Sequence, residues 1–127
     1  MRSKIVLLLS AAVAVLSGCV RTPVLMELPG NEEESLYGEA VGGPVGNGSF
    51  EVSSLQGLSC KGTYNSLSQS RSLKVEFICT DGRTGQAIVT RSGTNLTNGS
   101  GTGQLSDGQK VRILIGEFVH LRQGGYH

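Results

Sequence analysis

The chain has 127 residues, of which 11 are Lys or Arg and 10 are Asp or Glu, and its mean hydropathy is −0.02. A chain of this length holds one small domain. Its formal charge of +1 excludes the strongly basic surface typical of nucleic-acid-binding proteins and provides no polybasic face for anionic lipid headgroups.

The amino terminus has the pattern of a targeting segment. Arg2 and Lys4 precede an apolar run over residues 5–16, which only Ser10 interrupts. The run is shorter than the about 20 residues that a membrane-spanning helix needs, and it matches the about 7–15 residues of a signal-peptide core. We therefore expect residues 1–18 to be a signal peptide that is removed on export.

The residues that end this run, Leu16-Ser17-Gly18-Cys19, resemble the lipobox of bacterial lipoproteins. In that motif an apolar residue and two small residues precede an obligatory cysteine. The resemblance implies cleavage between Gly18 and Cys19 and a diacylglyceryl thioether, with palmitate, on Cys19. It also implies contact with the lipoprotein processing and sorting machinery. The alternatives are an ordinary secretory signal with a cysteine nearby, or an uncleaved anchor.

Lipid on Cys19 would supply the membrane attachment. Each buried methylene contributes about 0.8 kcal/mol and one acyl chain binds only reversibly, so two or three chains together make a lasting anchor. Val20, rather than aspartate, follows the cysteine, which in the enterobacterial sorting pattern resembles an outer-membrane destination. The expected location is the bacterial cell envelope, at the periplasmic face or outer surface of the outer membrane.

Two further cysteines, Cys60 and Cys79, remain in the mature chain. Because the chain is expected to fold in an oxidising compartment, we predict a disulfide between them. Closing a loop of this size stabilises a domain by about 3 kcal/mol in the chain-entropy model. A redox pair or a metal site stays an alternative, although the spacing is not C-x-x-C and no histidine lies nearby in the sequence.

The segment after Cys19, residues 19–35, contains two prolines, a glycine and three consecutive glutamates. It shows neither helical nor strand periodicity, so we expect a flexible tether between the lipid and a domain over residues 36–127. Glu32, Glu33 and Glu34 form either an acidic partner-binding patch or a solvated charge run.

Residues 36–127 have the pattern of an all-β domain. The turn dipeptides Asn-Gly and Asp-Gly recur at residues 47, 81, 98 and 107, and these residues tolerate the backbone of tight hairpins. We predict a small antiparallel meander, sandwich or barrel of about six or seven short strands. The expected strands are Phe50–Ser53, Gly57–Tyr64, Leu73–Cys79, Gln86–Arg91, Gly101–Leu105 and Lys110–Leu121.

Alternation within two of these strands supports their pairing. Leu73, Val75, Phe77 and Cys79 share one face of their segment, and Leu58, Cys60, Gly62 and Tyr64 share one face of theirs. A hairpin around residues 65–72 then places Cys60 beside Cys79. The segment Val111–Ile115 is apolar on nearly both faces, which predicts a central strand.

Two resemblances concern the β domain. The pairs Gly46–Phe50 with Lys61–Tyr64, and Gly101–Leu105 with Ile115–Phe118, resemble degenerate MORN-type hairpin repeats. They depart from that family in having Lys61 or Ile115 where a tyrosine is usual. The stretch from Gly57 to Gly116 also resembles small uncharacterised lipoproteins of alphaproteobacteria. This likeness implies a shared β domain and no particular activity.

Residues suited to catalysis are few. His120 is expected to face solvent on the last strand, and His127 is the last residue; a zinc site combining them with Asp107 is the weakest hypothesis. The turn at Asp81 and Arg83 could present a charged pair to a ligand, or Asp81 could simply bond backbone N–H groups of the turn. The sequence predicts no catalytic set, no metal and no cofactor.

The expected function is therefore that of a lipid-anchored envelope lipoprotein. Its domain is interpreted as a non-enzymatic structural or protein-interaction module that docks an envelope protein through a sheet face or edge. The alternative is a small envelope enzyme or enzyme inhibitor that acts through its loops. No interaction with nucleic acid is expected.

Overall fold

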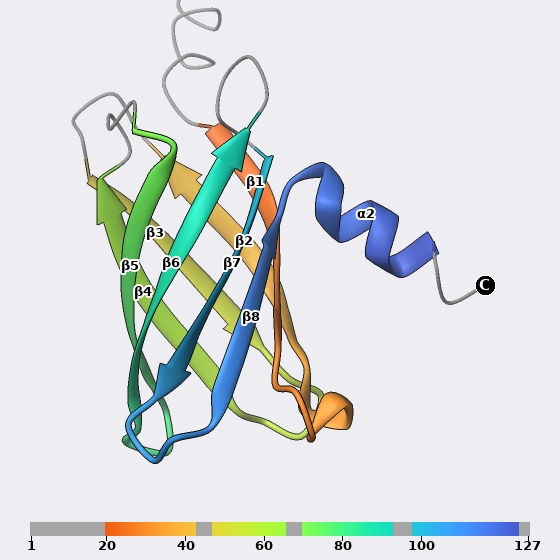
Figure 1. Cartoon of the computed structure of the whole chain (residues 1–127). Helices are drawn as coiled ribbons and strands as arrows, with labels where there is room; N and C mark the ends of the chain where they lie inside the picture. The colour runs from red at the N-terminus through yellow and green to blue at the C-terminus, as the bar shows by residue number, and fades with distance from the viewer. Residues whose placement is uncertain (1–19, 43–46, 66–69, 93–97, 125–127) are drawn as a thin grey trace, which may run out of the picture.

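The protein folds as a closed, eight-stranded antiparallel β-barrel (Figure 1). The structure, a computed structural model, describes residues 20–42, 47–65, 70–92 and 98–124. Each strand pairs with the next along the chain, and the last pairs with the first. The strands are β1 (Val20–Glu27), β2 (Leu36–Gly42), β3 (Asn47–Ser53), β4 (Ser59–Asn65), β5 (Ser72–Cys79), β6 (Thr84–Ser92), β7 (Asn98–Leu105) and β8 (Lys110–Ile115).

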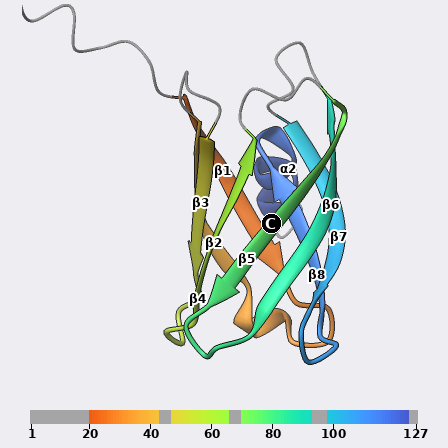
Figure 2. The same cartoon turned by 90° about the vertical axis from the view of Figure 1, so that its left-hand side faces the viewer.

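The barrel has two different ends. At the turn end, short connections span residues 28–35, 54–58, 80–83 and 106–109. At the amino-terminal end, β1 begins and β8 leads into helix α2 (Glu117–Gly124). Both views place the start of β1 and helix α2 at the end of the barrel opposite these turns (Figures 1 and 2).

The inward faces of the strands form the core. In β5 every second side chain is buried, as the sequence predicted, and the rings of Phe50 and Phe77 meet edge to face with centroids 6.1 Å apart. Eight strands enclose a space that side chains alone can fill. The enclosed apolar residues are Val24, Met26, Leu28, Leu36, Ala40, Phe50, Val52, Cys60, Leu73, Val75, Phe77, Cys79, Ala87, Val89, Leu105, Val111 and Ile113.

Strand β7 contributes almost no volume to this core. Its inward positions are Gly99, Gly101 and Gly103 before Leu105. A Cβ atom on Gly103 would lie 1.9 Å from the carbonyl oxygen of Gln86 on β6. The two backbones therefore approach so closely that only glycine fits at this position.

The prediction of a flexible tether over residues 19–35 is wrong for its described part. Residues 20–27 form β1, in which Val24 and Met26 are only 2% and 0% exposed. Pro23 lies beyond the last β1–β8 pair, so its missing N–H falls outside that ladder. Glu32, Glu33 and Glu34 form a short 3-10 helix, η2 (Glu32–Glu34), in the connection to β2.

The barrel has eight strands instead of the six or seven expected, because β1 and β2 were not anticipated. The other expected strands correspond to β3 through β8, with small shifts at their ends. The prediction of one strand over Lys110–Leu121 is wrong in its second half, since β8 ends at Ile115 and α2 begins at Glu117. In a closed barrel β8 is also no more central than its neighbours.

Helix α2 starts beside the barrel wall and then runs away from it (Figure 1). Val119 on this helix is 0% exposed. The first turn is held by β7, because the side-chain oxygen of Asn98 accepts a hydrogen bond from the backbone N–H of Glu117 at 2.9 Å. Gly116, with φ of 69°, makes the reversal between strand and helix.

Candidate functional site

The residues expected to carry the anchor, Gly18 and Cys19, lie outside the described residues. The first described residue, Val20, already belongs to β1. Within the described ranges, no helix is long and apolar enough to cross a membrane.

The predicted disulfide between Cys60 and Cys79 is confirmed. The two residues are register partners on β4 and β5, and their sulfur atoms are 2.02 Å apart. Both are enclosed in the core, with exposed fractions of 2% and 4%. The sulfurs bind each other inside the barrel, so their role here is to join two neighbouring strands.

The predicted ligand-contact turn places Arg83 between two carboxylates. Nε and Nη2 of Arg83 each lie 2.8 Å from Oδ2 of Asp81, and Nη1 lies 3.0 Å from Oδ2 of Asp107. Asp81 also accepts a hydrogen bond from the backbone N–H of Arg83 at 3.1 Å, as expected for a turn aspartate. One guanidinium thus joins the β5–β6 turn to the β7–β8 turn.

The charges of this cluster hold each other in the ionised state. Hydrogen bonds from Arg83 lower the pKa of Asp81. The pKa of Asp107 is lowered mainly by the backbone N–H of Gln109, with Arg83 adding to the effect. The bond to Asp81 raises the pKa of Arg83. These contacts give Arg83 and both carboxylates a structural role, while ligand binding by Asp81 and Arg83 stays a prediction.

A second link extends this network around the turn end. Gln109 donates to the carbonyl oxygen of Pro29 at 3.1 Å, and its own side-chain oxygen accepts from the amide of Asn31 at 2.7 Å. The connections 28–35, 80–83 and 106–109 are therefore tied together by side chains, which rigidifies this end of the barrel.

His120 and Asp107 lie too far apart in the barrel to share a metal ion. His120 is exposed on helix α2, at the amino-terminal end, whereas Asp107 lies at the turn end and pairs with Arg83. The expectation that His120 lies on a strand is wrong, and His127 is outside the described residues. In the part of the chain that the structure describes, no group of three or more His, Cys, Asp or Glu could hold a metal ion.

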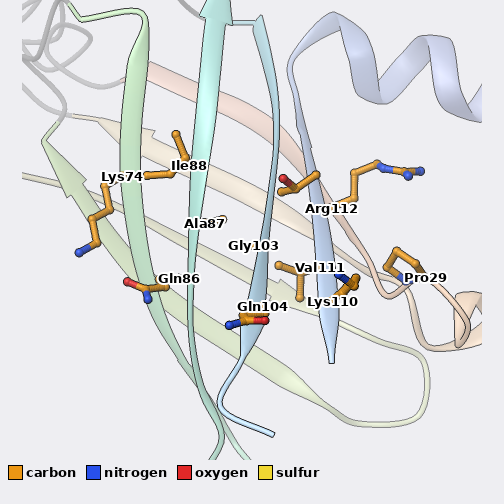
Figure 3. A pocket seen from close by; sticks show the side chains of 11 residues that line it. Pro29, Lys74, Gln86, Ala87, Ile88, Gly103, Gln104, Lys110, Val111 and Arg112 are labelled. Carbon is orange, nitrogen blue, oxygen red and sulfur yellow. The ribbon is translucent and has the colours of Figure 1, made fainter. Parts of the chain in front are cut away.

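A shallow groove crosses the outer wall of the barrel over β5 to β8 (Figure 3). Register pairing aligns Lys74 with Ile88 and Thr102 with Arg112 across it. The outer-wall groove is lined by Pro29, Lys74, Gln86, Ala87, Ile88, Thr102, Gly103, Gln104, Lys110, Val111 and Arg112.

Gly103 of β7 lies in the lining of the groove. Because β7 carries no inward side chains at Gly101 and Gly103, its backbone sits close to that of β6. In Figure 3 the long side chains of Lys74 and Arg112 point away from each other at opposite sides of the groove. The sequence placed both glycines in a MORN-like pattern, which gave no indication of a groove.

The groove is cationic and partly apolar. Its described lining contains three cations, Lys74, Lys110 and Arg112, and no carboxylate. Behind it, Nη1 of Arg112 lies 3.6 Å from Oε1 of Glu27, whose side chain is only 5% exposed. Ile88 is 52% exposed in the groove. This combination suits an acidic partner segment that also carries an apolar side chain.

One buried cation was missed by the sequence reasoning. Arg91 is 8% exposed and donates a hydrogen bond to the carbonyl oxygen of Ser70. Burial raises the pKa of Tyr64, and the positive charge of Arg91 acts in the opposite direction. The signal was available, since Arg91 shares the inward parity of Ala87 and Val89.

The chain matches no family model, no curated protein and no solved structure. The described residues of the first MORN-like pattern lie in β3 and β4, whereas the second pattern runs from β7 to the last residue of β8 and then into helix α2. The likeness to MORN repeats, to alphaproteobacterial lipoproteins and to the lipobox stays a prediction.

Proposed function

We propose that this chain is a lipid-anchored lipoprotein of the bacterial envelope, at the outer membrane, whose barrel is a non-enzymatic protein-interaction module. The observation that carries the anchoring is the motif Leu16-Ser17-Gly18-Cys19 at the end of an apolar leader. The residue types of the leader and motif suit export, cleavage before Cys19 and attachment of lipid to its thiol.

The outer-wall groove is the surface best suited to a partner. Every strand of the closed barrel has a neighbour on both sides, so addition of a partner strand to a sheet edge is disfavoured relative to binding on a face. The cations Lys74, Lys110 and Arg112 with the exposed Ile88 favour an acidic segment of an envelope protein. Opposite charges on the two partners also accelerate association.

The anchoring is tested by the intact mass of the protein extracted from membranes, compared with that of a Cys19→Ser variant. We expect a chain that begins at Cys19 and carries acyl mass, and no acyl mass in the variant. An unlipidated chain with an intact leader would contradict the proposal.

The interaction is tested by quantitative pull-down of the full lipidated protein from detergent extracts. We expect a stoichiometric partner that is lost with the double substitution Lys74→Glu and Lys110→Glu. Arg71→Glu is the matched control, because Arg71 is exposed and does not line the groove. Equal recovery of the partner with the unchanged protein, the double variant and the Arg71→Glu variant would exclude the groove as the binding surface.

A further inference from the structure

The barrel begins directly at the proposed anchor. Cys19 is bonded to Val20, and Val20 is already paired with Gly42 in the β1–β2 register. Consecutive Cα atoms are about 3.8 Å apart, so a lipidated Cys19 lies within one residue of the barrel wall. A flexible tether of about 16 residues would instead have separated the two by about 20–24 Å on average.

Strand β1 cannot be released to serve as a tether. Its Val24 and Met26 are enclosed in the core, and its pairing with β8 closes the barrel. Freeing β1 would expose these apolar side chains to water, which is unfavourable, and would open the sheet. The attachment point on the barrel is therefore fixed.

The attachment point lies at one end of the molecule. Val20 and helix α2 belong to the amino-terminal end, opposite the turn end (Figures 1 and 2). A tilted strand of eight residues, such as β1, spans about 20 Å along a barrel axis. The turns therefore stand well away from the plane in which the lipid would sit.

The two ends of the barrel also differ in charge, and the difference favours the amino-terminal end as the one nearer the membrane. The turn connections 28–35, 54–58, 80–83 and 106–109 carry five acids, Glu32, Glu33, Glu34, Asp81 and Asp107, and one base, Arg83, which gives a net charge of −4. Near the amino-terminal end, Arg21 pairs with Glu39 at 3.4 Å, and the exposed Arg71 is balanced by the exposed Glu117, so these charges cancel. Anionic headgroups repel the first end and tolerate the second.

We propose that the barrel stands upright on the bilayer, with its amino-terminal end against the lipid headgroups and its acidic turn end pointing away. This orientation rests on the proposed lipidation of Cys19. It leaves the outer-wall groove on the side of the barrel, where a partner can reach it. It also makes the turn connections the part of the protein most distant from the membrane.

The orientation is tested with the full lipidated protein in vesicles that contain anionic phospholipid and a lipid with a nitroxide on its headgroup. Single cysteines labelled with bimane report proximity to these headgroups by loss of fluorescence. Ser49→Cys and Ser100→Cys lie near the amino-terminal end on strands β3 and β7, four strands apart in the eight-stranded ring, and Leu55→Cys lies at the turn end of the β3–β4 hairpin. All three native positions are exposed.

We expect fluorescence loss at positions 49 and 100 and none at position 55. A flexible insertion of about 16 residues after Cys19, beginning with valine, should abolish the difference between the positions. Equal loss at all three positions in lipidated protein, or a difference that survives the insertion, would overturn the orientation alone. A chain without acyl mass that does not float with the vesicles would overturn the orientation together with the proposed function.

Discussion

Arg83 connects two of the turns at the turn end. Its side chain is 24% exposed, which is low for an arginine in a hairpin turn. It bonds Asp81 within its own turn and Asp107 in a turn 24 residues further along the chain. The Asp81–Arg83 contact was foreseeable from the Asp-Gly-Arg sequence, whereas the Asp107 contact depends on β6 and β7 lying side by side.

Replacing Arg83 with methionine is expected to change the pH dependence of stability. The pKa values of Asp81 and Asp107 lie below their ordinary value in the folded protein. As the pH falls below about 3.9, these carboxylates take up protons in the unfolded chain before they do so in the folded protein. The stability that the ionised carboxylates contribute above that pH is therefore lost as the pH falls through their folded-state pKa values. The Arg83→Met variant should show a weaker loss of stability below pH about 4 than the unchanged protein.

The measurement is the urea midpoint of unfolding between neutral and acidic pH. Arg71→Met serves as the control, because Arg71 is exposed and lies away from the turn end. If Arg83→Met and Arg71→Met gave the same acid profile as the unchanged protein, the turn-end cluster would not contribute to acid sensitivity.

At the scale of single elements, local alternation predicted the inward faces well where strands are long. Parity predicted the β4–β5 pairing, and this pairing agreed with the disulfide that the two remaining cysteines, Cys60 and Cys79, had indicated. Strand β1 was missed because two prolines, a glycine and three glutamates in residues 20–35 suggest a loop. What makes residues 20–27 a strand is the presence of β2 on one side and β8 on the other, which local composition does not report.

Helix α2 was missed for a related reason. Val119 and Leu121 alternate with Phe118 and His120, and such a short run fits a strand as well as a helix. Two features favour the helix over a continued strand. The positive φ of Gly116 turns the chain, and Asn98 on β7 accepts a hydrogen bond from the first turn of α2.

Truncating Met26 to alanine distinguishes a strand from a tether. Met26 is 0% exposed in the core, so its loss should lower the free energy of unfolding by about 2–5 kcal/mol, the usual range for a large buried aliphatic residue. Arg21→Ala in the same strand is the control, since the side chain of Arg21 is 66% exposed and its ion pair contributes little. Urea unfolding of the two variants measures the difference, and an unchanged midpoint for Met26→Ala would mean that β1 does not pack in the core.

At the scale of the whole molecule, the sequence left a meander, a sandwich and a barrel open. A barrel forms because residues 24–27 pair with residues 112–115, which lie nearly the whole length of the domain away in sequence. It depends also on the inward glycines of β7, which let two strands approach closely. The groove is lined by Pro29 and by residues of four strands, β5 to β8, so the candidate site could not be predicted before the fold.

Closure of the barrel should prevent copies of the chain from pairing through strand edges, and deletion of residues 20–27 tests this. Without β1, strands β2 and β8 each lose one neighbour, and their unpaired N–H and C=O groups become edges on which other copies can pair. We expect the deleted chain to form oligomers in light scattering, whereas Met26→Ala, which is destabilised but keeps the barrel closed, should stay monomeric. The comparison separates edge exposure from lost stability. A monomeric deletion variant with an unchanged β-type circular dichroism spectrum would mean that β2 and β8 can close the barrel without β1.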